Sequence, residues 1–306
     1  MTNLQAAAKQ WQTQGWVLVH DLVPVDDIDL AVNELWELFP TPDEYHSGSS
    51  AASTRFETDS TDDRYRPTDN RAAFEEAPSG ELSFRARQFL GLVMFPYSSM
   101  LLNRLHIHPN VVSFAQLAME ETDLRLYQAR TWGKYTGVTD YGQPFHQDRN
   151  HSIVPDRLEK GWWNMEGFLY LSDVEDDVGA TEILGGGPTL PKGKPISASG
   201  KRGSFLAYRP DIWHRGVNLT KPRGARFIMS TSFRHAGHEW IGFDSFQQHS
   251  NRGPWSKFAA SCSPEELALF GAPLPGHPYW TPELVDAFEE RYRGIDASPW
   301  RKNLPL

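Results

Sequence analysis

The sequence predicts a mainly β fold with flanking helices, and two features indicate it. From residue 124 onward, short segments of alternating apolar and polar residues are separated by glycine, proline and other turn residues. Such segments are typical of the strands of a jelly roll or barrel. No helix-like segment separates one of these strands from the next, as a parallel α/β sheet would require. We therefore expect an antiparallel core in residues 121–236.

The first 40 residues are expected to contain two helices and a strand. Residues 3–14 have helical spacing, and residues 16–20 are apolar enough for a strand. Residues 25–38 predict a second helix, with Asp26 or Asp27 as its N-cap. The apolar positions of this second helix form one stripe for the core, namely Ile28, Leu30, Ala31, Leu35 and Leu38.

The next 80 residues divide into a polar insertion and a helical segment. Residues 41–81 contain no Val, Ile, Leu or Met, so this stretch cannot build a packed element by itself. A segment of this length is either a lid over a functional site or a flexible insertion, and the sequence leaves both open. Residues 82–120 are expected to be helical, interrupted at Pro96 and Pro109.

The expected core is followed by a second helical region. Within the core, the strand-like segments are 124–131, 167–172, 181–184, 203–208, 212–217 and 227–233. Residues 237–306 return to helical spacing, most clearly at 264–270 and 282–291. A β core with appended helices can reach this length as one unit, so residues 1–306 are predicted to form a single domain.

Composition and charge restrict the partners. The formal net charge is −9, and lysine and arginine are not clustered. Binding to a phosphate backbone needs clustered positive charge, so no nucleic acid is expected as a partner. With 11 Trp, 17 Phe and 10 Tyr, the chain can instead build an aromatic-lined pocket for a small-molecule substrate.

Cys262 is the single cysteine, which excludes an internal disulfide and a cysteine-based zinc site. The first residues lack the features of a signal peptide. No stretch approaches the roughly 20 apolar residues that a membrane span needs. The sequence therefore predicts a soluble, cytoplasmic protein that does not act at a membrane.

The segment Gln143–Asp148 holds the pair of residues best suited to a metal ion. Residues i and i+2 of a strand point to the same face, so His146 and Asp148 can reach one ion together. Imidazole and carboxylate are two members of the facial triad of non-haem iron(II) sites, which needs one further histidine and leaves coordination positions open. Because a His-x-Asp pair arises easily by chance, the surrounding sequence must support this assignment.

That support comes from a later part of the predicted core. His214 lies in the strand-like segment 212–217 and can supply the third ligand. Two arginines follow it, Arg223 and Arg226. A 2-oxoacid that chelates the ion through one end leaves a carboxylate at its other end, and a buried arginine is the suitable partner for that carboxylate. We favour Arg223 for this role, with Arg226 as the competing candidate.

These runs resemble a known family. The sequence HQD, the intervening FLYLSDVEDDVGATEIL and the later WHRGVNLTKPR are similar to the phytanoyl-CoA dioxygenase family of 2-oxoglutarate-dependent oxygenases. The resemblance extends from about residue 14 to residue 234. It implies a cupin-like double-stranded β-helix, with Fe(II) held by His146, Asp148 and His214. It also implies 2-oxoglutarate and O2 as co-substrates, and hydroxylation or another oxidation of an unactivated C–H bond in a small molecule.

One upstream strand adds to the resemblance, and one turn departs from it. Tyr127–Arg130 is similar to the strand that precedes the metal motif of ectoine hydroxylases, which implies that Gln128 and Arg130 line the pocket for substrate and co-substrate. The family often has a Pro-Gly-Ser-His turn where this chain has Gly185–Pro188. The contacts on the substrate side therefore differ from the family pattern.

Other interpretations remain open. His146 and Asp148 could form a hydrogen-bonded core pair, and His214 could pack against Trp213. The fold could bind a ligand or metal without turnover, or belong to another cupin-type metal enzyme without an oxoacid, such as an isomerase. His106-Ile107-His108 has the spacing of the metal pair but no nearby carboxylate, so we expect no metal there. Desaturation, cyclisation and epimerisation use the same iron centre, and the resemblance selects no particular substrate.

Overall fold

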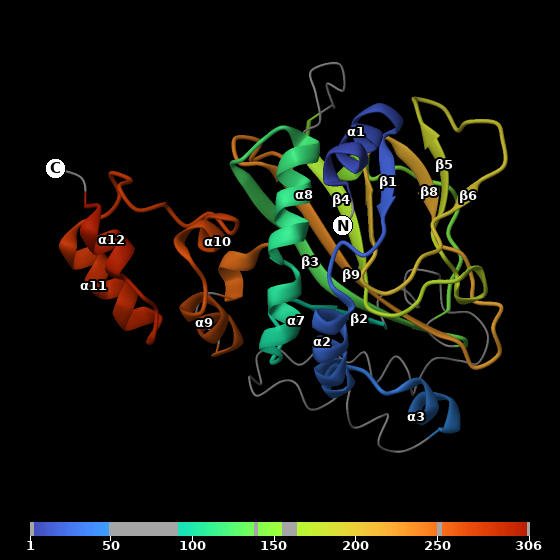
Figure 1. The fold of residues 1–306 in the computed structure, drawn as a ribbon, viewed down its shortest axis with the longest axis horizontal. Coiled ribbons are helices and arrows are strands. Elements are labelled where there is room, and N and C mark those ends of the chain that lie inside the picture. Colours follow the sequence, from blue (N-terminus) through green and yellow to red (C-terminus); the bar gives the residue numbers. More distant parts are fainter. Residues whose placement is uncertain (1–2, 49–90, 138–139, 155–163, 250–252, 305–306) are drawn as a thin grey trace.

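The computed structural model describes residues 3–48, 91–137, 140–154, 164–249 and 253–304. In these residues two antiparallel sheets pack face to face, and helices cover the outer face of the larger sheet (Figure 1). The predicted mainly β fold with flanking helices is therefore confirmed. Within the same residues, the two sheets stay separate and do not close into one continuous barrel.

The described chain begins with a helix and an edge strand. Helix α1 (Leu4–Gln14) starts at Asn3, whose side chain accepts a backbone hydrogen bond in the first turn, and ends at Gly15 with a φ of 83°. Glycine adopts this left-handed conformation without a steric penalty, so it ends the helix cleanly. Strand β1 (Trp16–Val19) then pairs with β7 (Phe205–Tyr208).

Helix α2 (Val25–Leu38) has the predicted bounds, but two predicted details are wrong. Its N-cap is Pro24, without a side-chain hydrogen bond, so neither Asp26 nor Asp27 caps it. Both aspartates lie in the first turn, where a negative charge still interacts favourably with the helix dipole. Leu30 is 56% exposed because it lies off the buried face. That face consists of Ile28, Ala31, Leu35 and Leu38.

The larger sheet has six strands in the order β1-β7-β4-β9-β3-β2, paired antiparallel throughout. Its other strands are β2 (Leu92–Met94), β3 (Leu124–Tyr135), β4 (Asn164–Tyr170) and β9 (Ala225–His235). The long strands β3 and β9 pair along their whole length, with a bulge in β3 between Leu126 and Gln128.

The smaller sheet has three strands in the order β6-β5-β8. These are β5 (Glu182–Gly186), β6 (Ile196–Ser197) and β8 (Ile212–Arg215). It packs on the inner face of the larger sheet, where both sheets contribute to one buried apolar cluster that includes Ile183, Ile212, Tyr170, Leu206, Tyr208 and Ile228. Each of the six strand-like segments of the sequence overlaps a strand of one of the two sheets.

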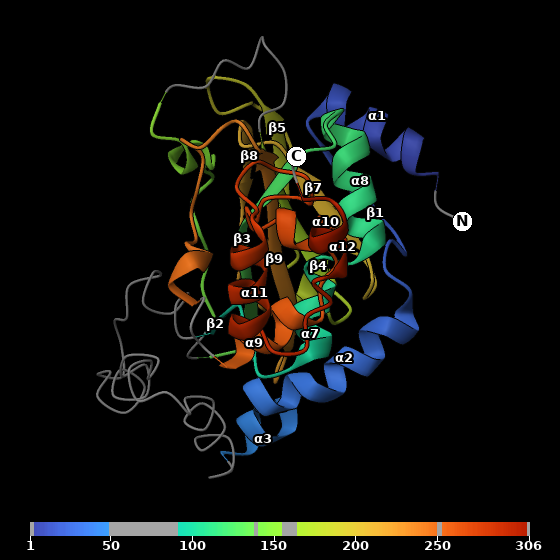
Figure 2. The same ribbon diagram turned by 90° about the vertical axis from the view of Figure 1, so that its left-hand side faces the viewer.

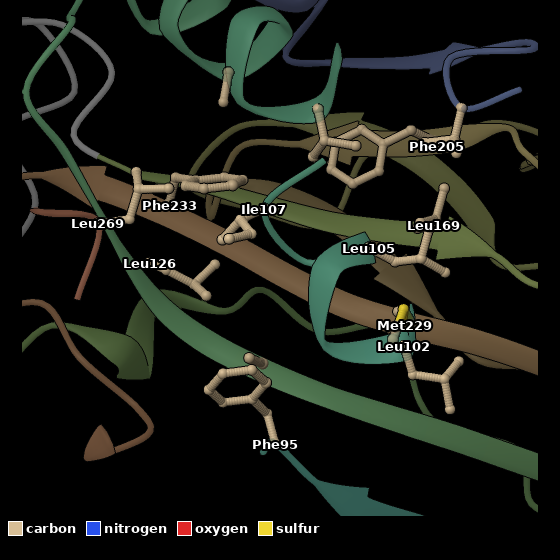
Figure 3. Close-up of a cluster of buried hydrophobic side chains, with 14 of the residues drawn as sticks. Phe95, Leu102, Leu105, Ile107, Leu126, Leu169, Phe205, Met229, Phe233 and Leu269 are labelled. Carbon is tan, nitrogen blue, oxygen red and sulfur yellow. The ribbon is translucent and has the colours of Figure 1, made fainter. Parts of the chain in front are cut away.

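The outer face of the larger sheet packs against helices α1, α7 (Met100–Leu105) and α8 (Pro109–Met119). Figure 3 shows part of this core, in which alternate strand residues meet side chains of α7 and the residues after it: Leu126, Leu169, Phe205, Met229 and Phe233 with Leu102, Leu105 and Ile107. Burial of each such side chain stabilises the fold by about 1.5–3 kcal/mol relative to exposure.

The expectation of a helical segment over residues 82–120 is wrong in part. Residues 92–94 form strand β2, because pairing with Arg130–Trp132 of β3 satisfies their backbone groups at the edge of the sheet. In the polar insertion, helix α3 (Pro42–Ser47) begins with a capping box. Most of the insertion, and residues 82–90, lie outside the described residues, so the interpretation as a lid or a flexible segment stays a prediction.

The C-terminal extension forms helices α9 (Gly253–Ala260), α10 (Pro264–Ala268), α11 (Pro282–Arg291) and α12 (Ser298–Lys302). Figures 1 and 2 show them on the side of α7. Leu269 follows α10, and its carbonyl accepts a hydrogen bond of 2.8 Å from the backbone N–H of Leu126, beside the bulge of β3. None of the helices in the described parts of the chain combines the length and the apolar character needed to cross a membrane.

Gly167 in the middle of β4 is required by close packing, and this gives a stability prediction. A Cβ atom there would lie 2.1 Å from Cζ of Phe205 and 2.6 Å from the carbonyl oxygen of Thr231. We expect Gly167→Ala to lower the free energy of unfolding by about 1–3 kcal/mol, measured by urea denaturation. Gly253→Ala is the matched control, because a Cβ there meets nothing within 4 Å. Equal stability of the two variants would contradict the packing argument.

Candidate functional site

The inner face of the larger sheet carries a row of polar side chains. Strand alternation points Gln128 of β3, Ser232 of β9, Glu166 of β4 and Tyr208 of β7 to this face. Gln128 is paired with Ser232 and Glu166 with Tyr208, and Ser232 donates a hydrogen bond of 2.8 Å to Glu166. The row crosses four neighbouring strands and ends beside Asp148, to which Tyr208 donates a hydrogen bond.

His146, Asp148 and His214 meet at the end of this row. One ligand atom from each lies within 4.8 Å of the other two, and no other such group of three occurs in the described residues. His214 belongs to β8, and His146 is bridged to it by backbone hydrogen bonds of 3.0 Å in both directions. Asp148 directly precedes a short 3-10 helix, Arg149–His151. His146 and Asp148 therefore lie in a loop that is bridged to β8, and not on the regular strand that their i, i+2 spacing suggested.

Both histidine rings are oriented so that Nε2 faces the carboxylate. Nδ1 of His146 lies 3.0 Å from the carbonyl oxygen of Pro144, and Nδ1 of His214 lies 3.0 Å from that of Ile212. A carbonyl oxygen only accepts, so each Nδ1 carries the proton and each Nε2 keeps its lone pair. The two Nε2 atoms lie 3.8 Å and 3.5 Å from the oxygens of Asp148. This is a donor set for a divalent metal ion.

The protonation states also suit metal binding. Burial alone would raise the pKa of Asp148, but the nearby histidines and the hydrogen bond from Tyr208 hold this pKa below its usual value. Burial lowers the pKa of His214 even though Asp148 opposes the shift. A charged carboxylate beside a neutral imidazole is the form in which these groups bind metals.

The two candidate arginines differ in their placement. Arg226 is 4% exposed, on the inner face of β9. One terminal nitrogen of its guanidinium donates to the carbonyl of Gly179, while its buried Nε has no hydrogen-bond partner. Arg223 is exposed on the turn before β9, with a φ of 54°, and donates to the carbonyl of His46 over 3.3 Å. Strand β9 begins at Ala225, so strand alternation applies to Arg226 and turns its side chain inward. Arg223 lies before the strand, and its exposed position gives no support to the preference for Arg223.

Arg226 also differs from the other buried cations. Among the described residues, each of the others faces a carboxylate, in the pairs Arg130–Asp244 at 2.5 Å, Lys134–Asp140 at 3.4 Å and His151–Glu166 at 2.9 Å. No described carboxylate lies within ion-pair distance of Arg226. Its charge does reach Lys134: burial, then Arg226, lowers the pKa of that lysine to about 7, against the opposing effect of Asp140. This end of the inner face is therefore short of negative charge.

Gln128 and Arg130, the two residues predicted to line a pocket, lie on the inner face of the larger sheet, where the row of polar side chains ends beside Asp148. The amide oxygen of Gln128 accepts hydrogen bonds from Ser230 and Ser232 at 2.7 Å and 3.0 Å. Arg130 is paired with Asp244, and the ring of Phe243 lies 4.2 Å from its guanidinium carbon. Both of these partners come from the C-terminal extension, which thus adds directly to the site.

Glu166, His151 and Tyr208 were not identified from the sequence as residues that hold the site. Glu166 accepts hydrogen bonds from four side chains, those of Tyr127, His151, Asn164 and Ser232. The pKa of His151 rises to about 9, because its attraction to Glu166 outweighs the effect of burial. A glutamate in the middle of the mostly apolar strand NMEGFLY was a usable signal, since a buried carboxylate needs partners.

His106 and His108, the other pair with i, i+2 spacing, have structural roles. His106 is fully buried on the helical side of the sheet, with Nε2 at 2.9 Å from the hydroxyl of Tyr97 and Nδ1 at 2.7 Å from that of Thr131. His108 caps helix α8, where its ring accepts a hydrogen bond from the backbone of Asn110.

Comparison with known proteins gives similarity of fold. No protein-family model matches the sequence, and no curated protein does. The structure is similar to SnoK, a non-haem α-ketoglutarate-dependent carbocyclase from nogalamycin biosynthesis, with a TM-score of 0.50, 10% identity, and coverage of 81% of this chain and 90% of that one. EvdMO1 has a TM-score of 0.50 and 13% identity over 76% of this chain, which spans only 50% of EvdMO1. SnoN, a non-haem α-ketoglutarate-dependent epimerase from nogalamycin biosynthesis, has a TM-score of 0.47 and 13% identity over 76% of this chain and 83% of that one.

The burial of His106 predicts a pH effect on stability. Burial lowers the pKa of His106 from 6.5 to about 3, so the folded protein holds it neutral while the unfolded chain takes up a proton below pH 6.5. Its contribution to stability is full above pH 6.5 and is lost as the pH falls towards 3. We expect His106→Asn to reduce the slope of melting temperature against pH between 6.5 and 4.5. The matched control is His108→Asn, the same substitution at the partly exposed N-cap of α8, and equal slopes for the His106 variant and wild type would contradict the prediction.

Proposed function

We propose that this protein is an Fe(II)- and 2-oxoglutarate-dependent dioxygenase that hydroxylates an unactivated C–H bond of a small-molecule substrate. The observation that carries the proposal is the meeting of His146, Asp148 and His214 at one point, with Arg226 buried on the inner face of the larger sheet and no described carboxylate within ion-pair distance of it. This ligand set is the facial triad of non-haem iron oxygenases. SnoK uses the same fold, but one fold hosts many reactions, so the site itself supports the proposal.

The charges of the site fit 2-oxoglutarate. An Fe(II) ion with Asp148 carries one net positive charge and Arg226 carries a second, while Lys134 is balanced by Asp140. The co-substrate is a dianion, so it neutralises both. A buried arginine without an anion is costly. An isomerase or a binding protein that uses no oxoacid would leave Arg226 in that state, and this disfavours both alternatives.

The residues of the chain have distinct tasks in this proposal. His146, Asp148 and His214 would hold the ion through two imidazole nitrogens and one carboxylate. Arg226 orients the far carboxylate of 2-oxoglutarate by charge-assisted hydrogen bonds. When bound, Fe(II) with 2-oxoglutarate supplies the activation of O2 that oxidation of a C–H bond needs.

The substrate side of the site is proposed to include Gln128 and Arg130. Two serines hold the amide of Gln128 at its oxygen end, and Asp244 takes one terminal nitrogen of Arg130. Within the described residues, Nε of Arg130 has no hydrogen-bond partner, and we propose that the free polar groups on this side orient a substrate. The runs HQD and WHRGVNLTKPR support a relationship to the phytanoyl-CoA dioxygenase family.

The proposed hydroxylation is distinguished from the other oxidations by the mass of the product formed under 18O2. Hydroxylation places one atom of 18O2 in the product, whereas desaturation, cyclisation and epimerisation do not.

The proposed function is tested without knowledge of the substrate. Fe(II) and 2-oxoglutarate added together under anaerobic conditions should produce a visible charge-transfer absorption band, and admission of O2 should yield succinate. Asp148→Ala should abolish both, because two imidazoles alone bind Fe(II) weakly. Asp173→Ala is the control, since that carboxylate is partly exposed and pairs with Lys201. Metal binding by wild type without the 2-oxoglutarate band would refute the proposal in favour of a metal protein that uses no oxoacid.

The two arginines allow a matched test of co-substrate binding. We expect Arg226→Gln to raise the dissociation constant of 2-oxoglutarate on the order of 100-fold, because a buried carboxylate loses its cation. The measurement is titration of the anaerobic Fe(II) protein with 2-oxoglutarate. Arg223→Gln, the same substitution on the exposed turn, should leave the constant within about threefold of wild type. The opposite ranking would restore Arg223 as the binding residue.

A further inference from the structure

One oxygen of Asp148 is already engaged by the protein. The hydroxyl of Tyr208 donates a hydrogen bond of 3.0 Å to Oδ2 of Asp148. Oδ1 accepts no hydrogen bond from the described residues and lies 3.8 Å from Nε2 of His146, while Oδ2, besides accepting from Tyr208, lies 3.5 Å from Nε2 of His214. The two oxygens of this carboxylate are therefore not equivalent before any ion is bound.

Tyr208 is held in place, so its hydroxyl cannot follow a moving carboxylate. It is 2% exposed, in the apolar cluster between the two sheets. Its ring packs against His214 at a centroid distance of 4.5 Å and against Phe168 at 5.7 Å. Its strand is paired on both sides, with Trp16 of β1 and Glu166 of β4 directly opposite Tyr208. A tyrosine fixed in this way acts as a rigid hydrogen-bond donor.

The backbone of Asp148 is also fixed from two directions. Its N–H donates to the carbonyl of Pro210 over 3.2 Å, and its carbonyl accepts a hydrogen bond of 3.2 Å from His151. The side chain of His151 is in turn paired with Glu166 on β4 at 2.9 Å. Glu166 and Tyr208 are neighbours across the sheet, so one short stretch of the larger sheet holds both the backbone and the side chain of Asp148.

We propose that Tyr208 is a positioning residue that makes Asp148 bind the metal ion through Oδ1 alone. The proposal rests on the proposed function. A carboxylate that bound through both oxygens would occupy a further coordination position. With two imidazoles and a bidentate co-substrate also bound, no position would then remain for O2 on a six-coordinate ion. The hydrogen bond at Oδ2 thus keeps one position open.

This role differs from that of an ordinary buried hydrogen bond. A bond that only stabilises the fold would change the melting temperature on removal and leave the metal site unaltered. Partners of metal ligands typically change the affinity for the ion by 10–100-fold when they are removed. Tyr170 provides the matched comparison, because it is equally buried in the same cluster and its hydroxyl donates to the carbonyl of Ala198 over 2.6 Å.

The test compares Tyr208→Phe with Tyr170→Phe in the full-length apoprotein, with Co2+ as the probe. We expect Tyr208→Phe to change the Co2+ dissociation constant by at least about 10-fold and to weaken the visible absorption of bound Co2+, because a higher coordination number reduces its intensity. Tyr170→Phe should lower the melting temperature and leave both metal readouts as in wild type. An unchanged affinity and spectrum in Tyr208→Phe would overturn the proposal.

A second measurement needs no substitution and holds even where Tyr208→Phe does not fold. Infrared difference spectra of the wild-type protein with and without Zn2+, after labelling with 13C-aspartate, report the separation of the two carboxylate stretching bands. A wide separation indicates binding through one oxygen, and a narrow separation indicates binding through two and overturns the proposal. If the carboxylate bands are narrowly separated while the wild-type protein still forms the charge-transfer band with Fe(II) and 2-oxoglutarate, only the role of Tyr208 is rejected. If the wild-type protein does not form that charge-transfer band, the proposed function is rejected.

Discussion

The bridge between the loop at residues 143–148 and strand β8 is the contact on which the site depends. The loop is not a strand of either sheet, yet the backbone N–H of Gln143 donates to the carbonyl of Gly216, and His146 and His214 exchange two backbone hydrogen bonds. The Gln143 side chain accepts a further hydrogen bond, from the backbone N–H of Gly216. These bonds extend the smaller sheet by one incomplete strand. Without them His146 would have no fixed position relative to His214, and the two imidazoles would not face the same carboxylate.

The larger sheet separates stability from chemistry. Its outer face is apolar and packs against helices, so most of the burial energy comes from this side. Its inner face carries paired charges and hydrogen-bonded polar groups that a simple core would not contain. The two faces are formed by alternate residues of the same strands. A polar substitution on the inner face can therefore alter the site while the apolar core on the other side remains intact.

Several features were predictable because their cause lies in nearby residues. Alternation along 124–131 and 227–233 predicted two central strands, and the bounds of α2 followed from its apolar stripe. The spacing of His146 and Asp148, with His214 later in the core, predicted the three residues that the structure brings together. Strand β2 was missed because its pairing partner lies more than 30 residues away, so local composition carried little information about it.

What the sequence by itself determined is the type and order of most elements and the group of His146, Asp148 and His214, because these depend on periodicity and spacing along the chain. The tertiary structure decided which arginine is buried, since only the start of β9 turns Arg226 inward. It also decided what surrounds the centre, through contacts such as Tyr208 with Asp148, 60 residues apart, and Arg130 with Asp244, 114 residues apart. Such pairs are set by sheet register and by the course of the C-terminal extension. Neither leaves a local pattern in the sequence, because each depends on where a distant strand or loop comes to lie.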